Sequence, residues 1–146
     1  TDADTERLIR MLLLHDVQEA LTGDYDSFAK EKMGMSKVKL RERTAVKRVL
    51  STLPADLKKR YVSLWEEFED RKSFEAVLAN DIDKIEMAAQ ALEYSKQGYD
   101  AGKLEAFLTS VQNEVKTPVV RDLFELLRMG EQLDNLHPKQ LRKILK

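Results

Sequence analysis

Apolar residues recur every three or four positions along nearly the whole chain, which is the spacing of an amphipathic helix. Only five glycines and three prolines interrupt the 146 residues, so few positions remain for the tight turns of a β-rich fold. No internal repeat or low-complexity tract accompanies this pattern. The sequence therefore predicts an all-α fold of several packed helices.

The size and composition indicate a single compact domain. A chain of 146 residues can bury one core without disulfides or a structural metal. The absence of cysteine excludes zinc fingers and thiol nucleophiles, and favours a reducing, cytoplasmic compartment. Because 25 Lys and Arg stand against 26 Asp and Glu, we expect no nucleic-acid partner. An apolar run such as Met11–Leu14 is too short for a membrane span, so we also expect a soluble protein.

The first third of the chain is expected to hold two helices. The first is predicted over residues 4–21, and Gly23 is expected to end it, since glycine accepts the backbone of a helix stop. A polar loop is predicted over residues 24–34. Ser36 is then expected to cap a second helix, whose apolar positions continue to Leu53.

Two further helices are predicted in the middle of the chain. Pro54 suits the first turn of a helix, and the acidic end of that helix, residues 66–70, is expected to face solvent. Ser73 is expected to cap a long helix that ends near Gly98.

The C-terminal part is predicted to hold two more amphipathic helices, over residues 104–115 and 118–130. The domain is expected to comprise residues 1–130. Residues 131–146 are predicted to form a polar tail, in which Pro138 could start a short helix.

An imidazole and a carboxylate stand side by side at His15 and Asp16, in the second half of the first predicted helix. Such groups cost stability among aliphatic residues unless they are paired or bind a metal. Because helical neighbours point about 100° apart, the two can share an ion only at the edge of the helix, and they need ligands from elsewhere. A surface pair or a capped core histidine is the alternative. A divalent-metal hydrolase site is the leading hypothesis, although the second histidine, His137, lies in the polar tail.

Three polar residues follow this pair closely. Glu19 lies four residues after His15 and three after Asp16, on the same side of a helix. Its carboxylate could orient or deprotonate a metal-bound water, or it could be an ordinary solvated glutamate. Gly23 permits the chain to turn sharply at the end of the helix. This turn would place Thr22 and Asp24 at the edge of the same site.

A second carboxylate candidate lies in the long helix. Asp83 is flanked by apolar Ile82 and Ile85, and a buried aspartate needs a partner. The partner could be a metal ion or a Lys or Arg side chain. Asp81, two residues earlier, could equally be the structural aspartate of this helix.

These residues resemble the HD-domain phosphohydrolases, and within them the 5′-deoxynucleotidase group. Residues 10–24, with the sequence Arg-Met-Leu-Leu-Leu-His-Asp-Val-Gln-Glu-Ala-Leu-Thr-Gly-Asp, are similar to the central motif of that family almost position for position. Further similarity covers Arg41-Glu42, Leu64–Glu69, Asp81–Met87 and Gln90–Tyr94. The resemblance as a whole covers about Thr5 to Met129.

Matched by motif position, the resemblance implies metal ligands at His15, Asp16 and Asp83, as the second, third and fourth of the family's four. Glu19 matches the acidic residue that is implicated in water activation. Asp24 matches an acidic residue near the sugar of the bound deoxynucleotide.

Two weaker substrate contacts are expected beside Asp24, namely Thr22 and Lys30. Lys30 falls where the family often has a lysine after its loop, although it could also be solvated. The family usually has proline in that loop, whereas residues 25–28 have none, so the loop departs from the family pattern.

The first ligand of the family, a histidine on an earlier helix, has no match before His15. Either the N-terminal helices of the family are missing from this chain, or the site is incomplete. The first is our expectation, because the downstream family residues are retained.

The resulting hypothesis is an HD-domain bundle acting as a metal-dependent 5′-deoxyribonucleotidase, which hydrolyses deoxynucleoside 5′-monophosphates to deoxynucleoside and phosphate. Mixed imidazole and carboxylate ligation suits Mn, Co, Fe, Ni or Zn better than Mg. The alternatives are another HD-type nucleotide phosphohydrolase or phosphodiesterase, and a non-catalytic helical interaction module with a vestigial site. The resemblance also implies a homodimer.

Overall fold

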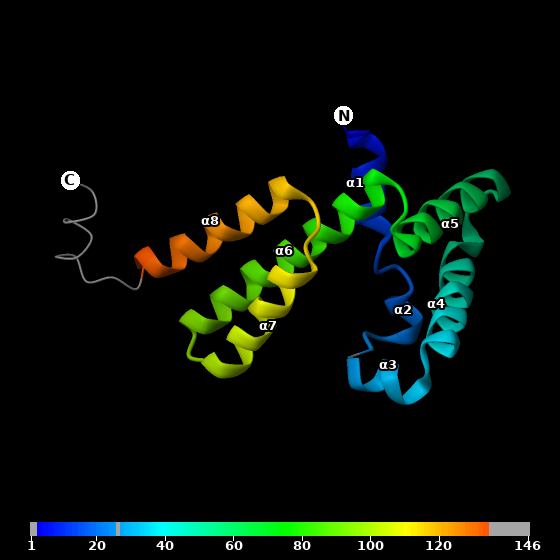
Figure 1. Cartoon of the computed structure of the whole chain (residues 1–146). Coiled ribbons are helices and arrows are strands. Elements are labelled where there is room, and N and C mark those ends of the chain that lie inside the picture. The colour runs from blue at the N-terminus through cyan, green and yellow to red at the C-terminus, as the bar shows by residue number, and fades with distance from the viewer. Residues whose placement is uncertain (1–2, 26, 135–146) are drawn as a thin grey trace. The chain divides into compact units, whose positions relative to one another are not determined.

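A computed structural model describes residues 3–25 and 27–134 of the chain (Figure 1). Every regular element in this part is a helix, which confirms the all-α prediction. The chain divides into two compact units, Thr1–Ala79 and Asn80–Lys146. None of the helices in the described ranges combines the length and the apolar character that crossing a membrane requires. The predicted short helix at Pro138, and His137, lie outside the described residues.

The first predicted helix is interrupted. α1 (Thr5–Leu14) begins as expected after Asp4, whose carboxylate accepts the amide of Arg7 at 3.0 Å. The helix ends at Leu14 instead of Leu21, and the short α2 (Glu19–Thr22) follows after a turn at residues 15–18. Gly23 ends α2 with a φ of 69°, as the sequence predicts.

The cause of the interruption lies in the backbone hydrogen bonds. The Glu19 amide donates to the carbonyl of Asp16 at 2.9 Å, three residues back, instead of four as in an α-helix. The carbonyl of His15 accepts the indole N–H of Trp65 at 3.1 Å. A side chain from a distant helix thus bonds the carbonyl that an uninterrupted α1 would offer to the Glu19 amide.

The predicted polar loop contains a helix. α3 (Ser27–Met33) occupies most of this loop. α4 (Met35–Val49) follows after a single intervening residue, Gly34. The prediction that Ser36 caps α4 is wrong, because the N-cap position is Gly34 with a φ of 83°. This left-handed backbone favours glycine and allows two helices to follow each other almost directly. The 3-10 turn η1 (Leu50–Thr52) closes α4.

α5 (Ala55–Asp70) begins directly after Pro54, and Arg71 ends it in the left-handed conformation. The prediction that the acidic end of α5 faces solvent is wrong for part of that segment. Glu66 is half-buried and pairs with Arg43 at 2.6 Å. Glu67 accepts hydrogen bonds from Arg7 of α1 and from Ser73, so it joins α1 to the segment that precedes the next helix.

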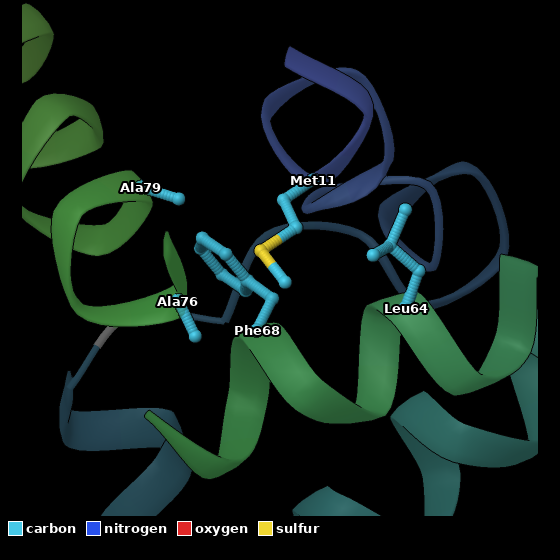
Figure 2. Close-up of a cluster of buried hydrophobic side chains, with 5 residues drawn as sticks. All are labelled: Met11, Leu64, Phe68, Ala76 and Ala79. Carbon is cyan, nitrogen blue, oxygen red and sulfur yellow. The ribbon is translucent and has the colours of Figure 1, made fainter. Parts of the chain in front are cut away.

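The core of the first unit lies between α1, α5 and the start of α6 (Phe74–Lys96). Figure 2 shows the Met11 side chain directed toward Phe68 of α5, with no exposed surface remaining on Met11. Ala76 and Ala79 of α6 and Leu64 of α5 complete this cluster. A second buried cluster joins α4 and α5 and consists of Val46, Leu50, Val62 and Trp65. The turn after α1 therefore meets α5 where Trp65 and Phe68 are buried.

The second unit consists of the rest of α6, α7 (Ala101–Glu114) and α8 (Pro118–Asp134). Ser73 caps α6 as predicted, since its hydroxyl accepts the Ala76 amide at 3.2 Å. α8 starts at Pro118 as predicted and continues past Gly130 to Asp134. An ion pair between Arg128 and Glu105, at 2.9 Å, joins α8 to α7.

Candidate functional site

His15 occupies the first position after α1, and its ring is fixed on two sides. Its Nδ1 lies 2.7 Å from the carbonyl oxygen of Leu12, one turn earlier. A carbonyl can only accept, so Nδ1 carries a proton, and in the neutral form of the ring Nε2 is the nitrogen that can bind a metal. The ring also packs against Phe68, with 5.5 Å between the ring centroids. A histidine whose one nitrogen donates to a backbone carbonyl has the usual arrangement of a metal ligand.

The carboxylate of Asp16 meets this imidazole. Asp16 Oδ2 lies 2.9 Å from His15 Nε2, and the Asp16 side chain is 55% exposed. Divalent transition metals bind imidazole nitrogen and carboxylate oxygen at about 2.0–2.2 Å, which places neighbouring donors about 3 Å apart. The two donors therefore fit a shared ion. The two side-chain ends meet although the backbone of His15 keeps helical angles, with φ −56° and ψ −37°.

Glu19 is the first residue of α2 and lies half-buried beside the pair. Burial raises the pKa of its carboxyl, and the negative charges of Asp16 and Asp24 raise that pKa further. Lys30 and His15 act in the opposite direction but do not cancel the shift. A carboxyl with a raised pKa is a stronger base than a solvated glutamate when it is ionised.

The three predicted substrate contacts differ in their surroundings. Asp24 is exposed after Gly23 and close enough to Glu19 to affect its pKa. The Thr22 hydroxyl lies 3.1 Å from the Gln18 carbonyl and 2.9 Å from the Gly23 carbonyl, so its proton is used within the loop. Lys30 lies on α3, with its Nζ 4.0 Å from Glu42.

Sequence reasoning missed two residues that hold the turn. Trp65, 4% exposed, donates its indole N–H both to the His15 carbonyl and to Gln18 Oε1, at 3.1 and 2.9 Å. Gln18, 6% exposed, lies within the turn itself. Apolar periodicity indicated Trp65 as a core residue, but spacing along the chain carries no information on the partner of its N–H.

The structure shows which hydrogen bonds Asp81 makes in α6. Asp81 is 3% exposed, and its Oδ2 accepts the amides of Lys116 and Thr117 and the Thr117 hydroxyl, at 3.0, 2.6 and 2.6 Å. Asp81 is therefore the structural aspartate of α6, one of the two alternatives that the sequence left open.

Asp83 is half-buried in the second unit, whereas the His15 turn belongs to the first. The assignment of Asp83 as a metal ligand stays a prediction. Within residues 3–25 and 27–134, no group of three or more His, Asp or Glu side chains is arranged to hold a metal ion.

Curated proteins are similar to this chain in sequence. The 5′-deoxynucleotidase HDDC2 of Dictyostelium discoideum is 36% identical over 128 residues, which cover 84% of this chain and 65% of the relative. The human 5′-deoxynucleotidase HDDC2 is 34% identical over 121 residues, covering 81% of this chain and 57% of the relative. The chain thus spans 57% to 65% of the length of these two curated relatives.

The fold is also shared. The crystal structure of a predicted metal-dependent phosphohydrolase from Magnetospirillum magnetotacticum MS-1 matches with a TM-score of 0.61 and 25% sequence identity. The match covers 88% of this chain and 66% of that one. A model of the HD domain matches residues 1–126, which include the His15-Asp16 turn and both aspartates of α6. By sequence and by fold, this chain belongs to the HD domain family.

Proposed function

We propose that the chain is the HD-domain part of a metal-dependent 5′-deoxynucleotidase, which hydrolyses deoxynucleoside 5′-monophosphates to deoxynucleoside and phosphate. The observation that carries this proposal is the convergence of His15 Nε2 and Asp16 Oδ2 at 2.9 Å, with a half-buried carboxylate at Glu19 beside them. The curated relatives that carry the name 5′-deoxynucleotidase support the substrate class. Residues 1–130 form the domain in this proposal.

A divalent ion would be held by His15 and Asp16, with Asp83 as the third ligand that the family resemblance implies. Imidazole with carboxylate suits Mn, Co, Fe, Ni or Zn better than Mg. When bound, such an ion supplies Lewis-acid stabilisation of negative charge on the phosphoryl oxygens. The Leu12 carbonyl accepts the Nδ1 proton of His15, so Nε2 is the ring nitrogen that would bind the ion.

Glu19 acts as the general base in this proposal. Its carboxylate accepts a proton from the water that attacks phosphorus, the P–O bond to the sugar breaks, and the departing 5′-oxygen takes up a proton from solvent to give the deoxynucleoside. Asp24 would face the sugar, and Lys30 would contact the phosphate. Thr22 has committed its proton to backbone carbonyls, so it would serve the substrate as an acceptor or shape the loop.

The substrate test is phosphate release from a panel of nucleotides in the presence of Mn²⁺ or Co²⁺. The panel holds deoxynucleoside monophosphates, ribonucleoside monophosphates, deoxynucleoside triphosphates and cyclic dinucleotides. The proposal expects release chiefly from the deoxynucleoside monophosphates. Activity confined to triphosphates or cyclic dinucleotides would instead identify another HD-type phosphohydrolase. A protein that binds no metal and releases no phosphate would be an interaction module with a vestigial site.

Matched variants separate the roles of the two carboxylates. Glu19→Ala should lower kcat by about 10²-fold to 10⁴-fold while the metal content stays near that of the parent. Asp16→Ala should lose bound metal and activity together. Glu31→Ala, which removes an exposed carboxylate of α3, is the control and should change neither quantity. Near-parental turnover of Glu19→Ala would show that Glu19 takes no part in the reaction, whereas loss of metal would make it a ligand.

We further propose a cytoplasmic homodimer. The cysteine-free composition suits a reducing compartment. Large apolar side chains are exposed on α3 and α4, among them Phe28 at 73% and Leu40 at 67%, and a second copy could cover them. Light scattering after size exclusion gives the mass in solution, and a monomer would contradict this assignment.

A further inference from the structure

The indole of Trp65 is bound to the turn that carries the candidate metal ligands. Its N–H lies within hydrogen-bond distance of two acceptors, the His15 carbonyl at 3.1 Å and Gln18 Oε1 at 2.9 Å. Both acceptors belong to residues 15–18, and Trp65 and Gln18 are almost fully buried. Trp65 is also the only tryptophan of the chain. One donor from α5 thus reaches both ends of the four-residue turn.

The backbone hydrogen bonds differ from those of an α-helix where this contact is made. Since the His15 carbonyl accepts the indole, the Glu19 amide turns to the Asp16 carbonyl at 2.9 Å. In an uninterrupted helix, the side chains at positions 15 and 16 would point about 100° apart. In the turn, His15 Nε2 and Asp16 Oδ2 lie 2.9 Å from each other. The turn that Trp65 contacts is therefore the segment in which the two donors lie close enough to face one ion.

Restoring the helix would be costly while the indole is present. If α1 continued as a straight helix, the His15 carbonyl would accept the Glu19 amide. Its hydrogen bond with the buried indole N–H of Trp65 would then be weakened. Of its two acceptors, the indole N–H would then keep only Gln18 Oε1. Phe68 limits the ring of His15 from the same face of α5, three residues after Trp65. α5 therefore sets both the backbone and the ring of this histidine.

We propose that Trp65, acting with Gln18, is a positioning residue that holds the His15-Asp16 turn in its metal-binding form. This inference rests on the proposed function, because it takes the turn to be part of a metal site. Trp65 contacts the backbone of one ligand and touches neither reacting atoms nor substrate in this scheme. Its effect should therefore appear first in the affinity for metal.

The first test compares Trp65→Phe with Val62→Ala by titrating Mn²⁺ into the protein in a calorimeter. Trp65→Phe keeps an aromatic ring but removes the N–H. Outer partners of metal ligands typically change metal affinity by 10-fold to 100-fold, and we expect a loss of about 10-fold. Val62 lies in the same buried cluster as Trp65, so Val62→Ala controls for lost packing and should leave the affinity within about 2-fold.

A second pair of variants isolates the N–H and remains informative if Trp65→Phe does not fold. Because the chain has one tryptophan, growth on an analogue alters this position alone. β-(3-Benzothienyl)alanine keeps the bicyclic shape and replaces N–H by sulfur, whereas 7-azatryptophan keeps the N–H. The first analogue should weaken Mn²⁺ binding about 10-fold, and the second should preserve it. Equal Mn²⁺ affinities for the two analogues would overturn the positioning role.

Different results would contradict the proposed metal site and the positioning role of Trp65. A parent protein that does not bind Mn²⁺ would contradict the proposed metal site. In that case, NMR of the His15 ring nitrogens in the metal-free protein still tests the turn. The thienyl analogue should disturb the Nδ1-protonated form that the Leu12 carbonyl selects, and the azatryptophan protein should retain it. Identical His15 spectra for both analogues would exclude a role of the indole N–H in holding the turn.

Discussion

Replacement of Asp81 by alanine should destabilise the second unit strongly. Asp81 is 3% exposed, and a single oxygen, Oδ2, accepts three hydrogen bonds from Lys116 and Thr117. Thr117 is 6% exposed, so in Asp81→Ala its amide and hydroxyl lose their acceptor away from water. Each buried donor left without a partner costs about 1–3 kcal/mol. Lys116 is exposed and its amide can turn to water, so the loss of unfolding free energy should be about 3 kcal/mol.

Urea unfolding followed by far-UV circular dichroism measures this loss. Asp81→Asn keeps one oxygen acceptor and should lose only about 1 kcal/mol. Asp122→Ala, an exposed aspartate of α8, is the matched control and should stay within about 0.5 kcal/mol of the parent. A loss below about 1 kcal/mol for Asp81→Ala would refute the assignment of Asp81 as the anchor between α6 and the start of α8.

Two further predictions concern the first unit. Asp4→Ala removes the acceptor for the Arg7 amide at the start of α1 and should lower the unfolding free energy by about 1 kcal/mol, measured by urea unfolding against the exposed-site variant Glu31→Ala. Burial, and then the charge of Glu42, raise the pKa of Glu69 above its ordinary value of 4.5. The folded protein therefore holds this proton more tightly than the unfolded chain, so the Glu69 contribution to stability should fall as pH rises from about 4.5 through the folded pKa. Glu69→Gln should remove that part of the pH dependence and raise stability at neutral pH, and an unchanged pH profile of thermal unfolding would contradict it.

The features that the sequence predicted correctly depend on residues close together in the chain. Apolar spacing gave the all-α fold, because one helical face is defined by positions three and four apart. The cap at Asp4 and the stop at Gly23 follow from bonds and dihedral angles that span at most one turn. The motif around His15 and Asp16 was also visible, since its residues are adjacent.

Features that depend on distant partners were not predictable from spacing. The loop between Gly23 and Gly34 read as polar, yet α3 forms there, and the left-handed backbone of Gly34 lets α4 follow directly. The acidic end of α5 read as a solvated face, yet Glu67 is held by Arg7, 60 positions earlier in the chain. Composition alone cannot tell a solvated carboxylate from a paired one, because the difference lies in which cation the fold brings near it.

The sequence by itself determined that the fold is all-α, where several helices begin and end, and which residues are candidate metal ligands. Only the tertiary structure decided that α1 breaks at His15, because the indole that takes its carbonyl lies 50 positions later on α5. It also showed that Asp81 has a structural role, since its carboxylate accepts the amide of Thr117, 36 positions later. In both cases a buried polar group needs a hydrogen-bond partner, and folding brings that partner from a distant part of the chain. The periodicity of nearby residues does not indicate which partner it is.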